Sequence, residues 1–93
     1  MTEVTLKFTG HVRARMKADR LNFAFEGGTL SDLLKALFAQ HNLRDLVLDA
    51  DDKVIPWSRL LVNGRFSEFL GGLNTSVQPG DEIVIIRPYV VAF

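Results

Sequence analysis

The side chains that most often carry chemistry are sparse in this sequence. The 93 residues include two histidines, His11 and His41, and no cysteine. Neither histidine has a carboxylate at a spacing that would complete a metal site or a catalytic pair, and a lone histidine in a polar segment is usually solvated. Without cysteine, disulfides, thiolate catalysis and thiolate zinc sites are excluded. We therefore expect no metal site.

No nucleophile motif accompanies these histidines. The G-x-S-x-G turn that exposes a catalytic serine is absent from the sequence. The glycines Gly27-Gly28 precede a segment with helical character, but the segment lacks the spacing and the lysine of a phosphate-binding loop. Helix capping by Thr29 and Asp32 explains these letters better. The sequence therefore predicts a protein that is not an enzyme and has no catalytic residues and no bound cofactor.

One segment is locally basic, with Arg13, Arg15, Lys17 and Arg20 close to His11. A solvated loop is the simplest interpretation, and docking to an acidic protein or, less favoured, to RNA is the alternative. The whole chain has eleven basic and eleven acidic residues, so no overall field attracts nucleic acid or an anionic membrane. No apolar run approaches the roughly eighteen residues of a membrane helix. We expect no nucleic acid and no membrane as partner, and a cytoplasmic location.

Hydrophobic periodicity indicates the elements of the first half. Alternating apolar residues predict strands over 4–8 and 21–25, which are close enough in sequence to pair as an antiparallel hairpin across a polar connection. Apolar residues at helical spacing predict one amphipathic helix after Thr29. We expect this helix to end near His41 and Asn42, with Asn42 in the left-handed conformation that often ends helices.

The second half is expected to contain a hairpin and a last strand. Residues 43–54 are predicted to be an irregular acidic loop. The dipeptide Asn63-Gly64 is the strongest hairpin signal in the chain, because both central residues of a type I′ turn need positive φ. Phe66 begins the return strand, and residues 82–87 form the final strand. Two hairpins around one helix indicate an α+β fold.

The final strand is apolar on both faces, as in a central strand that is covered from both sides. A single helix covers only one face of a sheet. One alternating pair should therefore point toward a partly open apolar face, either Val84 with Ile86 or Ile83 with Ile85. An open apolar face is typical of partner binding. The alternative is that loop 43–58, with its tryptophan, covers this face.

The last third of the chain resembles a known family. Its motifs are V-N-G-R from Val62, L-x-G-L-x-T from Leu70, G-D-E from Gly80 and a final Pro88. In this order they closely resemble the MoaD family, the small subunit of molybdopterin synthase, and more loosely the related ThiS proteins. The first half fits more loosely. The resemblance implies one ubiquitin-like β-grasp domain over 1–93, with a mixed sheet of four to five strands packed on one main helix.

In the MoaD family the carboxyl terminus is the working part. It ends in Gly-Gly, a partner enzyme activates it with ATP, and it carries sulfur as a thiocarboxylate. Here the residues after Pro88 are Tyr-Val-Val-Ala-Phe, which are bulky and partly β-branched. The internal pair Gly71-Gly72 is expected to serve a tight chain crossing. We therefore carry over the fold and the partner-facing surface and expect the terminal Gly-Gly and its sulfur chemistry to be lacking.

These observations predict a non-enzymatic MoaD-like subunit or adaptor, linked by family association to molybdenum or tungsten cofactor enzymes or their assembly. The expected partner is an activating-enzyme-like, synthase-like or molybdenum/tungsten-enzyme subunit, and the chain itself a monomer or small homo-oligomer. Apolar side chains of the open face and the tail are the predicted contacts: Tyr89, Val90, Val91, Phe93, Val84, Ile86 and Phe66. The alternatives are a sulfur carrier of the molybdopterin synthase small-subunit type with an atypical C-terminus, an RNA-binding β-grasp module, and a tail that covers its own sheet.

Overall fold

The computed structural model describes residues 1–56 and 58–87 of the chain. Its strands are β1 (Thr2–Thr9), β2 (Arg20–Phe25), β3 (Gly28–Thr29), β4 (Arg59–Val62), β5 (Arg65–Phe66), β6 (Ser76–Val77) and β7 (Glu82–Arg87). Its helices are α1 (Gly10–Met16), α2 (Leu30–Gln40) and α3 (Arg44–Val47), with two 3₁₀ turns, η1 (Ser67–Phe69) and η2 (Gly72–Asn74).

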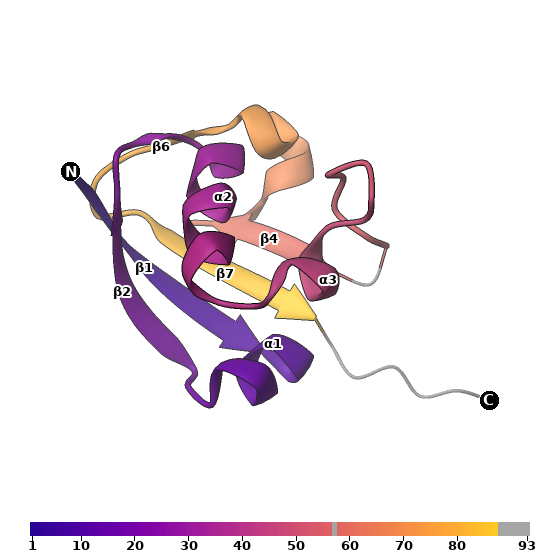
Figure 1. Cartoon of the computed structure of the whole chain (residues 1–93). Coiled ribbons are helices and arrows are strands. Elements are labelled where there is room, and N and C mark those ends of the chain that lie inside the picture. Colours follow the sequence, from indigo (N-terminus) through magenta and orange to yellow (C-terminus); the bar gives the residue numbers. More distant parts are fainter. Residues whose placement is uncertain (57, 88–93) are drawn as a thin grey trace.

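The main sheet has five strands in the order β2-β1-β7-β4-β5. The first and last long strands, β1 and β7, pair in parallel, and the other neighbours pair antiparallel. Strands β3 and β6 form a second, two-stranded sheet. Helix α2 crosses one face of the main sheet (Figure 1). This mixed sheet grasping one main helix is the β-grasp arrangement, so the predicted fold class is confirmed.

The core lies between α2 and the inner face of the sheet. Leu6, Ile83 and Ile85 from the two central strands are 0% exposed. They pack with Leu33 and Leu37, which lie on the apolar face of α2. Burial of one whole side chain of this kind contributes about 1.5–3 kcal/mol relative to leaving it in water. The apolar stripe predicted for the helix is therefore its packing surface.

Helix α2 begins with the predicted capping box. The Thr29 N–H donates to Asp32 Oδ2 at 2.9 Å, and the Asp32 N–H donates to Thr29 Oγ1 at 3.3 Å. The helix ends at His41, as expected, but its C-cap is extended (φ −135°, ψ 136°). Asn42 does not have positive φ, so its predicted left-handed conformation is wrong. The chain continues from this extended C-cap to Leu43, whose side chain is 0% exposed in the core.

Two segments that we expected to be loops contain helices. The basic connection between β1 and β2 forms α1, because Val12 is fully buried against the core and Lys17 ends the helix with a left-handed φ of 56°. Segment 43–54 contains α3 and an isolated bridge between Leu48 and Val54. In both places a few buried apolar contacts stabilise helices too short to persist alone.

The Asn63-Gly64 hairpin is confirmed. Asn63 has φ 52° and Gly64 has φ 86°, as a type I′ turn requires. The turn joins β4 to β5, with Leu61 opposite Phe66 and Val62 opposite Arg65. Because cross-strand partners share a face, Phe66 points to the same side of the sheet as Leu61.

Candidate protein-binding face

The outer face of the sheet, opposite α2, carries an apolar patch. Strand register places Val84 beside Leu61 and Ile86 beside Arg59, while Ile83 and Ile85 point to the core. The described part of loop 43–58 contributes its buried leucines and valine to the core, on the side of α2. The alternative that this loop covers the outer face is tested only for the described residues, since Trp57 lies outside them.

Aromatic side chains extend this patch toward the sheet edge. The rings of Phe66 and Phe69 meet edge to face, with centroids 6.3 Å apart and an interplanar angle of 70°. The Arg59 guanidinium lies 5.1 Å from the Phe66 ring centroid and its Nη1 donates to Glu68 Oε1 at 2.8 Å. Phe69 is 80% exposed, which is unusual for so large an apolar side chain. We call the set Leu61, Phe66, Phe69, Val84 and Ile86 the outer patch.

Three of the seven partner contacts predicted from the sequence lie together in the outer patch: Val84, Ile86 and Phe66. The other four, Tyr89, Val90, Val91 and Phe93, fall outside the described residues. Sequence reasoning missed Leu61 and Phe69. The register of the Asn63-Gly64 hairpin could have identified Leu61, whereas the exposure of Phe69 depends on the 3₁₀ turn η1 and has no sequence signal.

The V-N-G and G-D-E motifs form a clasp beneath one end of the patch. Asn63 Nδ2 donates to Asp81 Oδ1 at 3.0 Å, and the Glu82 N–H donates to Asn63 Oδ1 at 2.9 Å. The Asn63 N–H also donates to the Glu82 carbonyl at 2.8 Å, and the Gln78 N–H donates to Asp81 Oδ2 at 2.8 Å. The clasp ties the β4–β5 turn to the turn before β7, so it fixes the register that aligns Leu61 with Val84.

The internal pair Gly71-Gly72 serves the chain crossing that we expected. Gly71 has φ 151° and Gly72 has φ 60°, and both lie between η1 and the end of η2. A left-handed conformation is strained for residues with a Cβ. The Thr75 hydroxyl then donates to the Gly72 carbonyl at 2.7 Å. This diglycine is a structural feature of the connection that carries Phe69.

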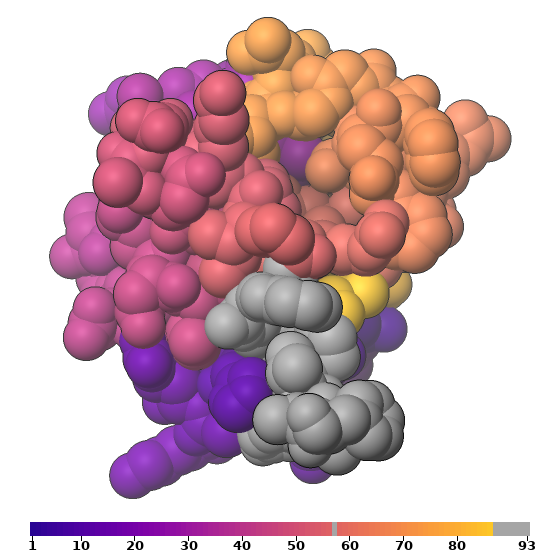
Figure 2. All heavy atoms as spheres, turned by 90° about the vertical axis from the view of Figure 1, so that its right-hand side faces the viewer, coloured from indigo at the N-terminus to yellow at the C-terminus, as the bar shows by residue number. Residues whose placement is uncertain are grey.

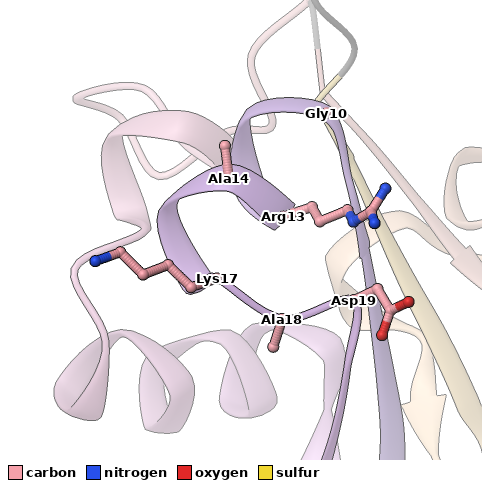
Figure 3. Close-up of a pocket in the computed structure, with 6 residues that line it drawn as sticks. All are labelled: Gly10, Arg13, Ala14, Lys17, Ala18 and Asp19. Carbon is pink, nitrogen blue, oxygen red and sulfur yellow. The ribbon is translucent and has the colours of Figure 1, made fainter.

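The basic segment does not converge on one site. In Figure 3 the Arg13 side chain extends toward Asp19, while Lys17 extends in the opposite direction. Arg15 turns to α3, where it pairs with the Asp45 carboxylate and donates to the Asn42 carbonyl at 3.1 Å. The shallow hollow beside α1 is lined by two diverging cations and one carboxylate, an arrangement that does not favour a polyanion there.

The carboxylates with shifted pKa values accept hydrogen bonds from backbone N–H groups. Hydrogen bonds from the Thr29 amide and hydroxyl hold the pKa of Asp32 below its usual range. The amide of Lys53, with a smaller effect from that of Asp51, does the same for the pKa of Asp49. Within residues 1–56 and 58–87, no group of three or more potential ligands is placed to hold a metal ion. No helix among these residues is long and apolar enough to cross a bilayer.

The five-stranded mixed sheet and the main helix define a ubiquitin-like β-grasp protein. The ThiS family model matches residues 6–89, so the chain belongs to the ThiS family. The resemblance to MoaD and ThiS proteins predicted from the sequence is therefore confirmed. Members of the family are non-catalytic small modifiers and sulfur carriers, and the prediction that this chain is not an enzyme is confirmed by its family.

Solved structures share the fold. Small archaeal modifier protein 1 from Methanosarcina acetivorans superposes with a TM-score of 0.82 and 24% identity, covering 99% of this chain and 98% of its own. Urm1 from Trypanosoma brucei gives 0.79 and 21%, covering 98% and 96%. A chain of the BexX/CysO complex of Amycolatopsis orientalis gives 0.76 and 20%, covering 96% and 99%. That relative forms a complex with another protein. No curated protein matches this chain closely in sequence.

Proposed function

We propose that this chain is a sulfur carrier or small modifier of the ThiS type that works by docking on a partner protein through the outer patch. The observation that carries the proposal is the family match over residues 6–89, which includes all of β7. This match supports the carrier role better than the adaptor role that we expected from the sequence. A setting in molybdenum or tungsten cofactor assembly, and a cytoplasmic location, belong to the proposal and rest on the MoaD resemblance.

The outer patch supports docking by its chemistry. It is apolar at its centre, where Val84 and Leu61 lie side by side, and polar at its rim, where Lys7 pairs with Glu82 at 3.1 Å. Such a centre and rim are typical of protein interfaces. Exposed aromatic side chains such as Phe69 are frequent anchors in these interfaces. The tail contacts predicted from the sequence, Tyr89 to Val91 and Phe93, remain part of this proposal.

Intact mass spectrometry tests the carrier role. The full chain is incubated with ATP, sulfide and a ThiS-type activating enzyme, and a reaction without ATP is the control. A carrier gains the mass difference between sulfur and oxygen at its C-terminus, only when ATP is present. An unchanged mass, with the activating enzyme active on its own carrier, would contradict the carrier role and leave the adaptor role. The same reaction on a chain truncated after Pro88 shows whether residues 89–93 are needed.

A further inference from the structure

A second candidate surface lies between α2 and the β4–β5 edge of the sheet, next to the outer patch but lined by other residues. Two hollows adjoin at Leu73, which lines both of them. Their volumes are about 300 Å³ and about 590 Å³. Figure 2 shows the surface hollowed between the segment near residues 50–56 and the segment near residues 67–74. We call the two hollows together the Leu73 groove.

The floor of the groove is apolar. Leu34, Phe38 and Leu48 line the smaller hollow together with Leu73. Ile55 and Leu60 line the larger hollow. Phe38 and Leu73 are only partly buried although they pack against the core, so they retain apolar surface that an occupant can cover. Neither hollow contains a residue of the outer patch.

The charges at the rim are unbalanced. Of four cations that line the groove, Arg44 pairs with Asp52, and Arg59 pairs with Glu68 at 2.8 Å. The two remaining cations are Lys35 in the smaller hollow and Lys53 in the larger one. Neither lysine forms an ion pair with any described residue. The residues that line the groove therefore include four cations and two carboxylates, in a chain whose formal net charge is zero.

The carboxylates nearest to these lysines are engaged elsewhere. Lys35 and Lys53 act electrostatically on Asp32 and Asp49. Asp32 accepts the Thr29 N–H at 2.9 Å, and Asp49 Oδ1 accepts the N–H groups of Asp51 and Lys53 at 2.8 Å and 3.0 Å. Both carboxylates accept backbone N–H groups, and neither lies within ion-pair distance of its lysine, so both ammonium groups can donate hydrogen bonds to an anionic group of an occupant.

We propose that the Leu73 groove binds a peptide segment of a partner protein that combines bulky apolar residues with acidic ones. The apolar side chains lie in the two hollows, on either side of Leu73, and the carboxylates face Lys35 and Lys53. Charge complementarity at the rim selects the acidic segment, and burial of Phe38 and Leu73 contributes affinity. The groove and the outer patch share no lining residue, but they adjoin where Arg59 of the groove contacts the Phe66 ring.

Titration of the ¹⁵N-labelled full chain with three synthetic peptides tests this site. The first peptide alternates Leu and Phe with Asp and Glu, the second has Lys at each acidic position, and the third has Ser at each apolar position. We expect the first peptide alone to shift the amide resonances of Lys35, Leu48 and Leu73. Absence of these shifts with the first peptide, or equal shifts with the basic peptide, would overturn the proposal.

Charge reversal separates the groove from nonspecific attraction. The double variant Lys35→Glu/Lys53→Glu should weaken binding of the acidic peptide about tenfold, a typical loss for two rim charges. Arg13→Glu/Lys17→Glu is the matched control, since it changes the net charge by the same amount and both residues are exposed and line neither hollow. Equal affinity of both variants would contradict the site. Shifts at Leu73 that depend on protein concentration without peptide would instead show that a second copy fills the groove, and would also overturn the proposal.

Discussion

The two faces of β7 carry the same residue types but play different roles. Ile83 and Ile85 are 0% exposed against α2, whereas Val84 and Ile86 are partly exposed on the other face. One face is a packed core, and the other carries similar apolar side chains that the described residues bury only in part. This difference shows that a run of apolar residues in a strand indicates a central position in the sheet. The elements that pack on each face determine which of these residues stabilise the fold and which can contact a partner.

The largest expected effect is a difference in the free energy of unfolding between substitutions on the two faces of β7. Ile85→Ala should lower the free energy of unfolding by about 3 kcal/mol, because it removes buried methylenes and leaves a cavity. Val84→Ala on the outer face should cost about 1 kcal/mol or less, since that side chain is already partly hydrated. Urea unfolding followed by circular dichroism measures both. Equal losses would mean that the outer face is as well packed as the core.

The next effect concerns the clasp that aligns the outer patch. Asn63→Ala should lower the free energy of unfolding by about 2 kcal/mol, because it removes two side-chain hydrogen bonds. Alanine also adopts positive φ less readily than asparagine does. Asn63→Gly keeps the backbone conformation and loses only the hydrogen bonds to Asp81 and Glu82, so it should cost less. If both variants unfold at the wild-type urea concentration, the clasp does not stabilise the register.

A smaller loss of stability is expected from a substitution at Gly72, in the connection that follows Phe69. Gly72 has φ 60° and open space around the position of an added Cβ. Gly72→Ala should therefore cost about 1 kcal/mol from backbone strain alone. Thermal unfolding measures the loss, and Ala39→Gly on the exposed side of α2 is a control of similar size for a helix. A stabilised Gly72→Ala variant would contradict the assigned conformation.

The smallest effect is a pH dependence at the start of α2. The folded-state pKa of Asp32 lies below the ordinary value of 3.8. The carboxylate therefore adds stability that is present above pH 3.8 and is lost as pH falls through the folded-state pKa. Asp32→Asn should flatten the decline of the melting temperature in this acidic range. An identical decline in the variant and the wild type would show that the capping box does not set the pKa.

Local signals in the sequence predicted much of the fold. The alternation before Phe8, the capping box at Thr29 and the Asn63-Gly64 turn each specify structure within a few residues, and the structure has all three. Helix α1 was missed because only Val12 of its residues is buried, and a single tertiary contact leaves no periodic pattern. Its polar letters therefore resembled those of a loop.

The candidate site was less accessible to sequence reasoning. Which face of β7 is covered depends on how the strand pairs with β1 and β4, and these contacts join residues far apart in the chain. The clasp is a similar case, since Asn63 and Asp81 are 18 positions apart. The exposure of Phe69 follows from the path of η1. Each of these features requires the assembled sheet.

The most direct test of the account compares two carboxylates added to the same sheet face. Val84→Asp places a charge in the outer patch, and Asn22→Asp places one on β2, which pairs only with β1 at the opposite edge. Binding to a ThiS-type activating enzyme is measured by calorimetry, after both variants are shown to melt cooperatively. We predict that Val84→Asp weakens binding at least about tenfold, because docking takes the added carboxylate out of water in an apolar interface, while Asn22→Asp binds as the wild type does. Equal binding by both variants would contradict docking through the outer patch.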